Sequence, residues 1–202
     1  MRAKICGITN TTDALAAVNF SAWAIGFVFY EKSPLCITIR RAREIVSALP
    51  RGTLTVGVFV DSEPNVMVKS FDFLGLAQVY SDVKVADDYK NRMIFGLQAS
   101  CAEDLPKESV LADYGYVLLD APRASDGKYG GTGRLANWNL ARELAKNHRL
   151  ILAGGLNPSN VAEAIDCVRP FAVDVSSGVA KRTREKDHSR MEQFLMECGR
   201  EK

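Results

Sequence analysis

The strongest constraint on the fold of this 202-residue chain is a regular succession of eight short apolar runs, each followed by a more polar stretch. The runs are "AKIC" (3–6), "AIGFVF" (24–29), "LTVGVFV" (54–60), "LAQVY" (76–80), "MIFGL" (93–97), "YVLLD" (116–120), "LILAG" (150–154) and "AVDVS" (172–176). Their apolar residues are continuous rather than alternating with polar ones. This pattern is typical of parallel strands that are buried on both faces.

The stretches between these runs have the periodicity of helices. Apolar side chains recur at helical spacing over residues 39–49, 138–147 and 158–168. We expect Asn157 to cap the last of these helices, because an asparagine side chain accepts a free amide of the first turn. Pro158 suits the turn that follows, since its fixed backbone angle is already helical.

Eight strand–helix units in succession, without a linker or a low-complexity segment, favour one compact (β/α)8 barrel over residues 1–202. A doubly wound open sheet is the alternative arrangement of the same units. The first run is not followed by a Gly-x-Gly-x-x-Gly motif, which counts against that alternative.

The composition excludes several classes of protein. The chain is 47% hydrophobic, and its net charge of +2 gives no reason to expect a nucleic acid or a membrane surface as partner. Because we find neither a signal peptide nor an apolar run of membrane-spanning length, the expected location is the cytoplasm. Five scattered cysteines predict no disulfide framework, and two histidines without a Cys-x-x-Cys pair predict no metal site.

Two residues with chemical potential close apolar runs. In a barrel the carboxyl ends of all strands meet at one face, where the active site lies, so Cys6 and Asp120 would open into the same pocket. Each also has a structural interpretation: a buried free cysteine often only fills space, and Asp120 could cap a helix or form an ion pair. Together on one face, they suggest a general base and a general acid.

Two glycine- and serine-containing motifs predict a phosphate site. "LAGGLNPSNV" (152–161) and "VDVSSGV" (173–179) follow the seventh and eighth runs, where barrels of this kind bind phosphate through backbone amides. The alternative is that the glycines only permit tight turns. The residues expected to bind phosphate are Gly154, Gly155, Ser176, Ser177 and Gly178.

A third glycine-rich segment, "KYGGTGRLANW" (128–138), lies between the sixth run and the next helix. Its glycines allow a flap that closes over a ligand, with Gly131, Thr132 and Gly133 as the expected contacts. The alternative is a connector without a role in function.

Six motifs in order give the chain a family resemblance. They are "KICGIT" (4–9), "GFVFYEKSP" (26–34), "GVFV" (57–60), "LLDA" with "YGGTG" (118–121, 129–133), "LAGGLNP" (152–158) and "VDVSSGV" (173–179). With these motifs the chain resembles the phosphoribosylanthranilate isomerase family of tryptophan biosynthesis. The resemblance implies a (β/α)8 barrel that catalyses an Amadori rearrangement, converting a ribosylamine to an aminodeoxyribulose, without a cofactor or a metal.

The resemblance also implies roles for individual residues. Asp120 would be the general acid that protonates the ring oxygen, and Cys6 the base that removes a proton from C2. By strand alternation Lys4 lies on the same face as Cys6, so its charge is expected to help lower the pKa of the thiol. Asp174, in the last motif, is counted among the residues that contact the substrate.

The chain departs from the family pattern at the end that would hold the anthranilate. Leu35 stands where the family usually has an arginine for the substrate carboxylate, and Lys32 or Arg40 is the expected substitute. Tyr80 replaces a family histidine near the pocket. The basic run "KRTREKDHSR" (181–190) is interpreted mainly as a solvated face, with added positive potential near the phosphate as the lesser alternative.

These observations predict a small phosphorylated molecule as the binding partner, with a monomer as the favoured assembly. Two other functions stay open at the level of sequence. One is an isomerase of a different phosphoribosyl amine, and the other is a catalytically weakened homologue that binds phosphosugars.

Overall fold

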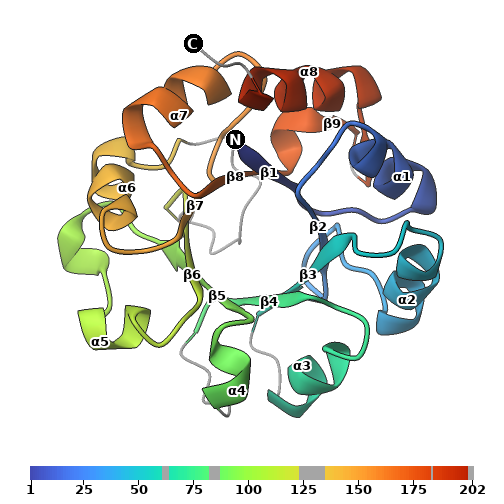
Figure 1. Cartoon of the computed structure of the whole chain (residues 1–202), viewed down its shortest axis with the longest axis horizontal. Helices are drawn as coiled ribbons and strands as arrows, with labels where there is room; N and C mark the ends of the chain where they lie inside the picture. The colour runs from blue at the N-terminus through green and yellow to red at the C-terminus, as the bar shows by residue number, and fades with distance from the viewer. Residues whose placement is uncertain (61–63, 82–86, 123–134, 183, 200–202) are drawn as a thin grey trace.

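The computed structural model describes residues 1–60, 64–81, 87–122, 135–182 and 184–199, and in it eight parallel strands close into one barrel (Figure 1). Each strand pairs with the next, and the first pairs with the last, so the barrel prediction is confirmed and the open sheet is excluded. The strands are β1 (Arg2–Ile5), β2 (Ala24–Val28), β3 (Leu54–Phe59), β4 (Leu76–Val79), β5 (Met93–Gln98), β6 (Tyr116–Asp120), β7 (Leu150–Leu152) and β8 (Ala172–Val175).

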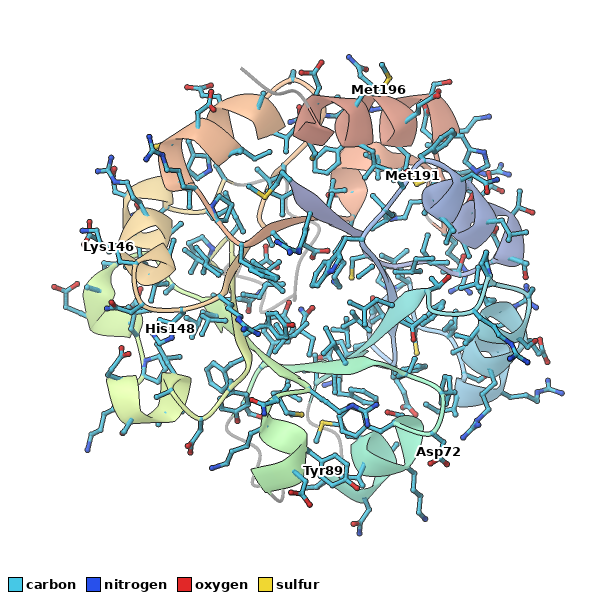
Figure 2. All side chains as sticks on the ribbon, viewed as in Figure 1. Asp72, Tyr89, Lys146, His148, Met191 and Met196 are labelled. Carbon is cyan, nitrogen blue, oxygen red and sulfur yellow. The ribbon has the colours of Figure 1, made fainter. Side chains whose placement is uncertain are left out.

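Helices form an outer ring around the strands. They are α1 (Thr11–Asn19), α2 (Ile39–Ser47), α3 (Pro64–Ser70), α4 (Asp87–Lys90), α5 (Glu108–Leu111), α6 (Trp138–Ala145), α7 (Val161–Val168) and α8 (His188–Gly199). Two of them, α4 and α5, have only four residues each. Such short helices allow a chain of 202 residues to form all eight strand–helix units of the barrel. The side chains labelled in Figure 2 belong to this outer layer and the turns beside it.

Two packed layers stabilise the barrel. Apolar side chains between the strands and the helices form the larger core. A second cluster fills the inside of the barrel, and the aromatic rings of Trp23, Tyr116 and Phe171 cover it at the amino ends of the strands. The amino end is therefore closed by apolar packing, which leaves the carboxyl end for polar chemistry.

The starts of two helices differ in how closely they follow the local sequence. Asn10 caps α1 by accepting a hydrogen bond from the Asp13 amide at 2.8 Å, the usual role of an asparagine just before a first turn. Helix α7, in contrast, begins at Val161 and not at Pro158. The Asn157 side chain accepts hydrogen bonds from the amide and hydroxyl of Ser159 and so stabilises a turn before the helix.

A short antiparallel hairpin follows the last barrel strand. It consists of β9 (Ala180–Arg182) and β10 (Glu185–Lys186), and it leads directly into α8. None of the described helices combines the length and the apolar character that crossing a bilayer requires.

Gly26 on β2 makes room for two side chains, one from β1 and one from the residue that follows it. A Cβ atom at residue 26 would lie 2.8 Å from the sulfur of Cys6 and 3.1 Å from Cε of Lys4. We therefore expect Gly26→Ala to destabilise the protein by about 1–3 kcal/mol, because the added methyl group overpacks the interior. Urea unfolding measures this change. Gly199→Ala is the control, since a Cβ there meets nothing within 4 Å; equal stability of Gly26→Ala and the wild type would contradict the packing described.

Candidate active site

A cavity of about 330 Å³ opens at the carboxyl ends of the barrel strands. Residues at or just beyond the ends of β1, β2, β3, β4, β6, β7 and β8 line it, together with residues of the β9–β10 hairpin. The cavity brings together Cys6 and Asp120, which come from the ends of β1 and β6, two strands that do not pair with each other. Among the described residues, no group of three or more His, Cys, Asp or Glu side chains lies close enough to hold a metal ion.

A buried ion pair lies at the base of this cavity. Lys4 on β1 is fully buried, and its Nζ is 2.9 Å from Oδ1 of Asp174, its neighbour in register on β8. Burial alone would lower the pKa of Lys4, but the charges of Asp174 and Cys6 raise it above its usual value. Lys4 therefore stays protonated and places a fixed positive charge inside the barrel.

Cys6 follows β1 and is held by hydrogen bonds at both of its backbone polar groups. Its amide donates to the Val175 carbonyl at 2.8 Å, and its carbonyl accepts from Nζ of Lys186 at 2.6 Å. Burial raises the pKa of the Cys6 thiol, and this effect exceeds the lowering by Lys4. Lys4 thus lowers the pKa of the thiol as expected, and burial makes the net shift upward.

Asp120 is the last residue of β6 and has a strongly shifted acidity. Its Oδ1 accepts a hydrogen bond of 2.8 Å from the Ala121 amide. Burial raises the pKa of Asp120 to about 6, with Asp174 adding to the shift and the Ala121 amide and Lys4 opposing it. A carboxyl group with this pKa keeps a proton in part of the molecules at neutral pH, as a general acid requires.

Most of the residues predicted to bind phosphate line the same cavity. Gly154, Gly155, Ser176 and Ser177 are all found there, after β7 and β8. The two glycines have positive φ angles of 79° and 67°, which side-chain-bearing residues rarely adopt, so the loop shape itself depends on glycine. Gly178 is not among the lining residues; a side chain there would collide with the Leu156 carbonyl, so glycine at this position permits the close packing of the two loops.

The remaining predicted contacts divide into two groups. Tyr80 lines the cavity, its hydroxyl accepts a hydrogen bond of 2.9 Å from Gln78, and burial raises its pKa well above the usual value. Lys32 and Arg40 are exposed and are not among the residues that line the cavity. Gly131, Thr132 and Gly133 of the predicted flap lie outside the described residues.

Sequence reasoning missed the contribution of the β9–β10 hairpin, which brings Arg182, Arg184 and Lys186 to the cavity. The interpretation of the whole basic run as a solvated face is therefore wrong for Lys186, which is buried and donates to the carbonyls of Cys6 and Ser176. Burial lowers the pKa of Lys186 to about 8. Strands of three and two residues are too short to show a periodicity in the sequence. The basic composition of residues 181–190 is the only sequence feature that singles out this segment.

Together, the fold and the cavity define a (β/α)8-barrel enzyme with an acidic group and a thiol at the carboxyl ends of its strands. Comparison with known proteins gives the family. Residues 3–197 match the family model described as N-(5'-phosphoribosyl)anthranilate (PRA) isomerase. The chain belongs to this family.

Individual relatives agree with the family model. An N-(5'-phosphoribosyl)anthranilate isomerase of Trichlorobacter lovleyi is 43% identical over 201 residues, covering 96% of both chains. The crystal structure of the Thermotoga maritima phosphoribosyl anthranilate isomerase superposes with a TM-score of 0.84, 38% identity and 98% coverage of both chains. A further isomerase structure, in complex with reduced 1-(o-carboxyphenylamino)-1-deoxyribulose 5-phosphate, has a TM-score of 0.81 and 37% identity, covering 98% of this chain and 97% of that chain.

The shifted pKa of Asp120 has a consequence for stability. A carboxyl group with a pKa of about 6 in the folded chain and about 3.9 when unfolded destabilises the fold wherever it is ionised, above the unfolded value. We expect Asp120→Asn to raise Tm by a few degrees at about pH 7.5, with the gain shrinking as the pH falls through 6 and vanishing near about pH 4. Calorimetry across this range measures it. The exposed Asp72→Asn is the control, and a gain that does not depend on pH would refute the assignment.

Proposed function

We propose that this chain catalyses the Amadori rearrangement of N-(5'-phosphoribosyl)anthranilate to 1-(2-carboxyphenylamino)-1-deoxyribulose 5-phosphate, a step of tryptophan biosynthesis, with Asp120 as general acid and Cys6 as general base. The observation that carries the proposal is the meeting of these two groups in one cavity beside the loops after β7 and β8. Family membership and the relative that binds the reduced product analogue support it.

Asp120 would act first, on the furanose ring. Its proton passes to the ring oxygen, the bond between this oxygen and C1 breaks, and the nitrogen lone pair forms an iminium at C1. A carboxyl group with a pKa of about 6 suits this step, because part of the molecules carry its proton near neutral pH and the group still releases it readily. Asp120 is left as a carboxylate in a partly buried position.

Cys6 would act second, on the opened chain. The iminium makes the proton on C2 acidic, and the thiolate of Cys6 removes it while the released electron pair forms the double bond between C1 and C2. The resulting enolamine takes up a proton at C1 and loses one from the C2 hydroxyl, which gives the ketone. No electrons are gained or lost overall, so the reaction needs no redox partner.

The two lysines near Cys6 favour the thiolate that this step requires. Lys4 and Lys186 both lower the pKa of Cys6, although burial has the larger effect. Lys186 also fixes the turn after β1 through the Cys6 carbonyl. We assign both lysines the role of positioning residues that stabilise the thiolate when it forms.

We also propose a monomer in a reducing, cytoplasmic environment. The large hydrophobic side chains exposed on the described surface, namely Met1, Val66, Leu135 and Met196, are scattered through the sequence rather than contiguous. A catalytic thiol and four other free cysteines suit a compartment in which thiols stay reduced.

The catalytic assignment predicts the effect of removing each group. Cys6→Ser and Asp120→Asn are each expected to lower kcat by roughly 10²–10⁴ while circular dichroism stays unchanged, since a positioned acid or base contributes about that much. Turnover is followed by the loss of anthranilate-type fluorescence from fresh substrate. Cys101→Ser and Asp72→Asn, at exposed positions, serve as matched controls. Near-wild-type turnover in either active-site variant removes that residue from the mechanism.

The phosphate assignment predicts competition by inorganic phosphate. Phosphate should inhibit competitively at tens of millimolar, and it should raise Tm by mass action, because it binds the folded chain at Gly154, Gly155, Ser176 and Ser177. Steady-state kinetics and thermal scans measure both effects, with sodium chloride at equal ionic strength as the control. Noncompetitive inhibition, or a Tm gain matched by chloride, would place phosphate elsewhere.

A further inference from the structure

The cavity has to accommodate two anionic groups if the proposed function holds, and this inference rests on that function. One is the phosphate of the ribose, and the other is the carboxylate on the aromatic ring. Neither Lys32 nor Arg40 lines the cavity, so the expected substitutes do not supply a cation there. Three cationic side chains among the described lining residues remain to be considered, all from the β9–β10 hairpin: Arg182, Arg184 and Lys186.

Two of these three cations already have partners. Lys186 is buried, and its ammonium group donates to the carbonyls of Cys6 at 2.6 Å and Ser176 at 3.0 Å. Arg182 forms a two-point ion pair with Glu185, in which its Nε and Nη2 each contact one carboxylate oxygen. Both groups are therefore engaged within the protein.

Arg184 is held differently. Its Nη1 donates to the carbonyls of Pro34 at 2.9 Å and Cys36 at 3.0 Å, and its own carbonyl accepts from the Thr9 hydroxyl at 2.7 Å. Its Nε and Nη2 make no hydrogen bond or ion pair with another described residue. The guanidinium is thus fixed on the loop after β2 without an acidic partner among the described residues.

The backbone of Arg184 supports a functional reason for arginine at this position. Its φ angle is 70°, in the left-handed region that glycine adopts freely and a side chain such as arginine rarely does. A residue kept in such a conformation destabilises the chain locally, and such residues are concentrated at ligand sites.

The surroundings of Arg184 fit an aromatic acid. In the sequence, Leu35 lies between the two residues whose carbonyls Arg184 contacts. Its side chain lies against Gly7, just after β1: a Cβ atom added to Gly7 would be 2.6 Å from Cδ1 of Leu35. The apolar part of the cavity wall on this side of the barrel is formed by Val28, Tyr30, Pro34, Leu35, Val58 and Val60. The glycine loop after β7 is separated from the loop after β2 by two strands, so the two anionic groups have separate places.

We propose that Arg184 binds the carboxylate of the aromatic ring and so determines the specificity of this enzyme for a 2-carboxyphenyl amine. The ring packs on the apolar wall that includes Leu35, and the carboxylate accepts hydrogen bonds from Nε and Nη2 of Arg184. These two donors present the fork geometry that carboxylates prefer. Leu35 then provides contact for the ring and no charge.

Two stable ligands and calorimetry test this assignment without relying on turnover. One ligand is reduced 1-(2-carboxyphenylamino)-1-deoxyribulose 5-phosphate, and the other is the same compound without the carboxyl group. Arg184→Gly should weaken binding of the first about tenfold and leave binding of the second unchanged, because an exposed charge-assisted pair contributes near the low end of its range. Tm should stay equal or rise, since glycine accepts the φ angle without strain.

Kinetics supply a second readout with matched variants. Arg184→Gly should raise KM with kcat little changed, since the carboxylate is bound alike in the ground and transition states. Arg184→Lys should restore only part of the affinity, and adding Leu35→Arg to Arg184→Gly should restore much of it by moving the charge to the adjacent loop. Arg41→Ala is the control for loss of a surface charge, since this partly exposed arginine lies on α2 and does not line the cavity.

Each contrary outcome has a distinct meaning. Equally weaker binding of both ligands would mean that Arg184 only supports the loop, and would overturn the proposal. Weaker inhibition of Arg184→Gly by inorganic phosphate would place Arg184 at the phosphate instead of the carboxylate, and would overturn it too. Unchanged binding of the carboxylated ligand would also overturn it. If the wild type binds and turns over nothing, the proposed function itself fails; if the wild type is active and only the ligand comparison fails, the assignment of Arg184 alone is wrong.

Discussion

The buried ion pair between Lys4 and Asp174 is the interaction on which the active end of this barrel depends. It joins β1 to β8, the two strands whose pairing closes the barrel, and it does so where the apolar interior gives way to the cavity. Removing one partner of such a pair leaves an unpaired charge in the interior, which costs about 3–5 kcal/mol. The same pair sets the local potential, because Lys4 and Asp174 act in opposite directions on the pKa of Cys6.

The groups around the cavity share one property: burial is the largest influence on the acidity of each. It raises the pKa values of Cys6 and Asp120 and lowers that of Lys186. All three groups are therefore held in surroundings that favour their neutral forms more than water does. A site of this kind trades stability for proton transfer near neutral pH, and the packed amino end of the barrel compensates for that loss.

The amino-acid sequence predicts the framework well because the framework follows local rules. Continuous apolar runs become buried parallel strands, and residues that close those runs meet at one face, so the order of residues alone is enough to place Cys6 and Asp120 in one pocket. The features that it does not predict depend on tertiary contacts. Asn157 stabilises a turn instead of capping a helix. Lys186 is buried through a hairpin whose strands are too short to give a pattern in the sequence. Lys32 is a sequence neighbour of residues that line the cavity but does not line it itself.

The position of the β9–β10 hairpin has an evolutionary consequence. The hairpin pairs only with itself and lies outside the hydrogen-bonded ladder of the barrel, yet it brings charged side chains to the mouth of the cavity. Substitutions in its exposed part can therefore change the charge that meets a substrate without disturbing strand pairing. Selection can act on substrate preference in this segment while the proton-transfer groups at the ends of β1 and β6 stay fixed. Descendants of such a barrel can therefore acquire new substrates through a few substitutions at exposed positions.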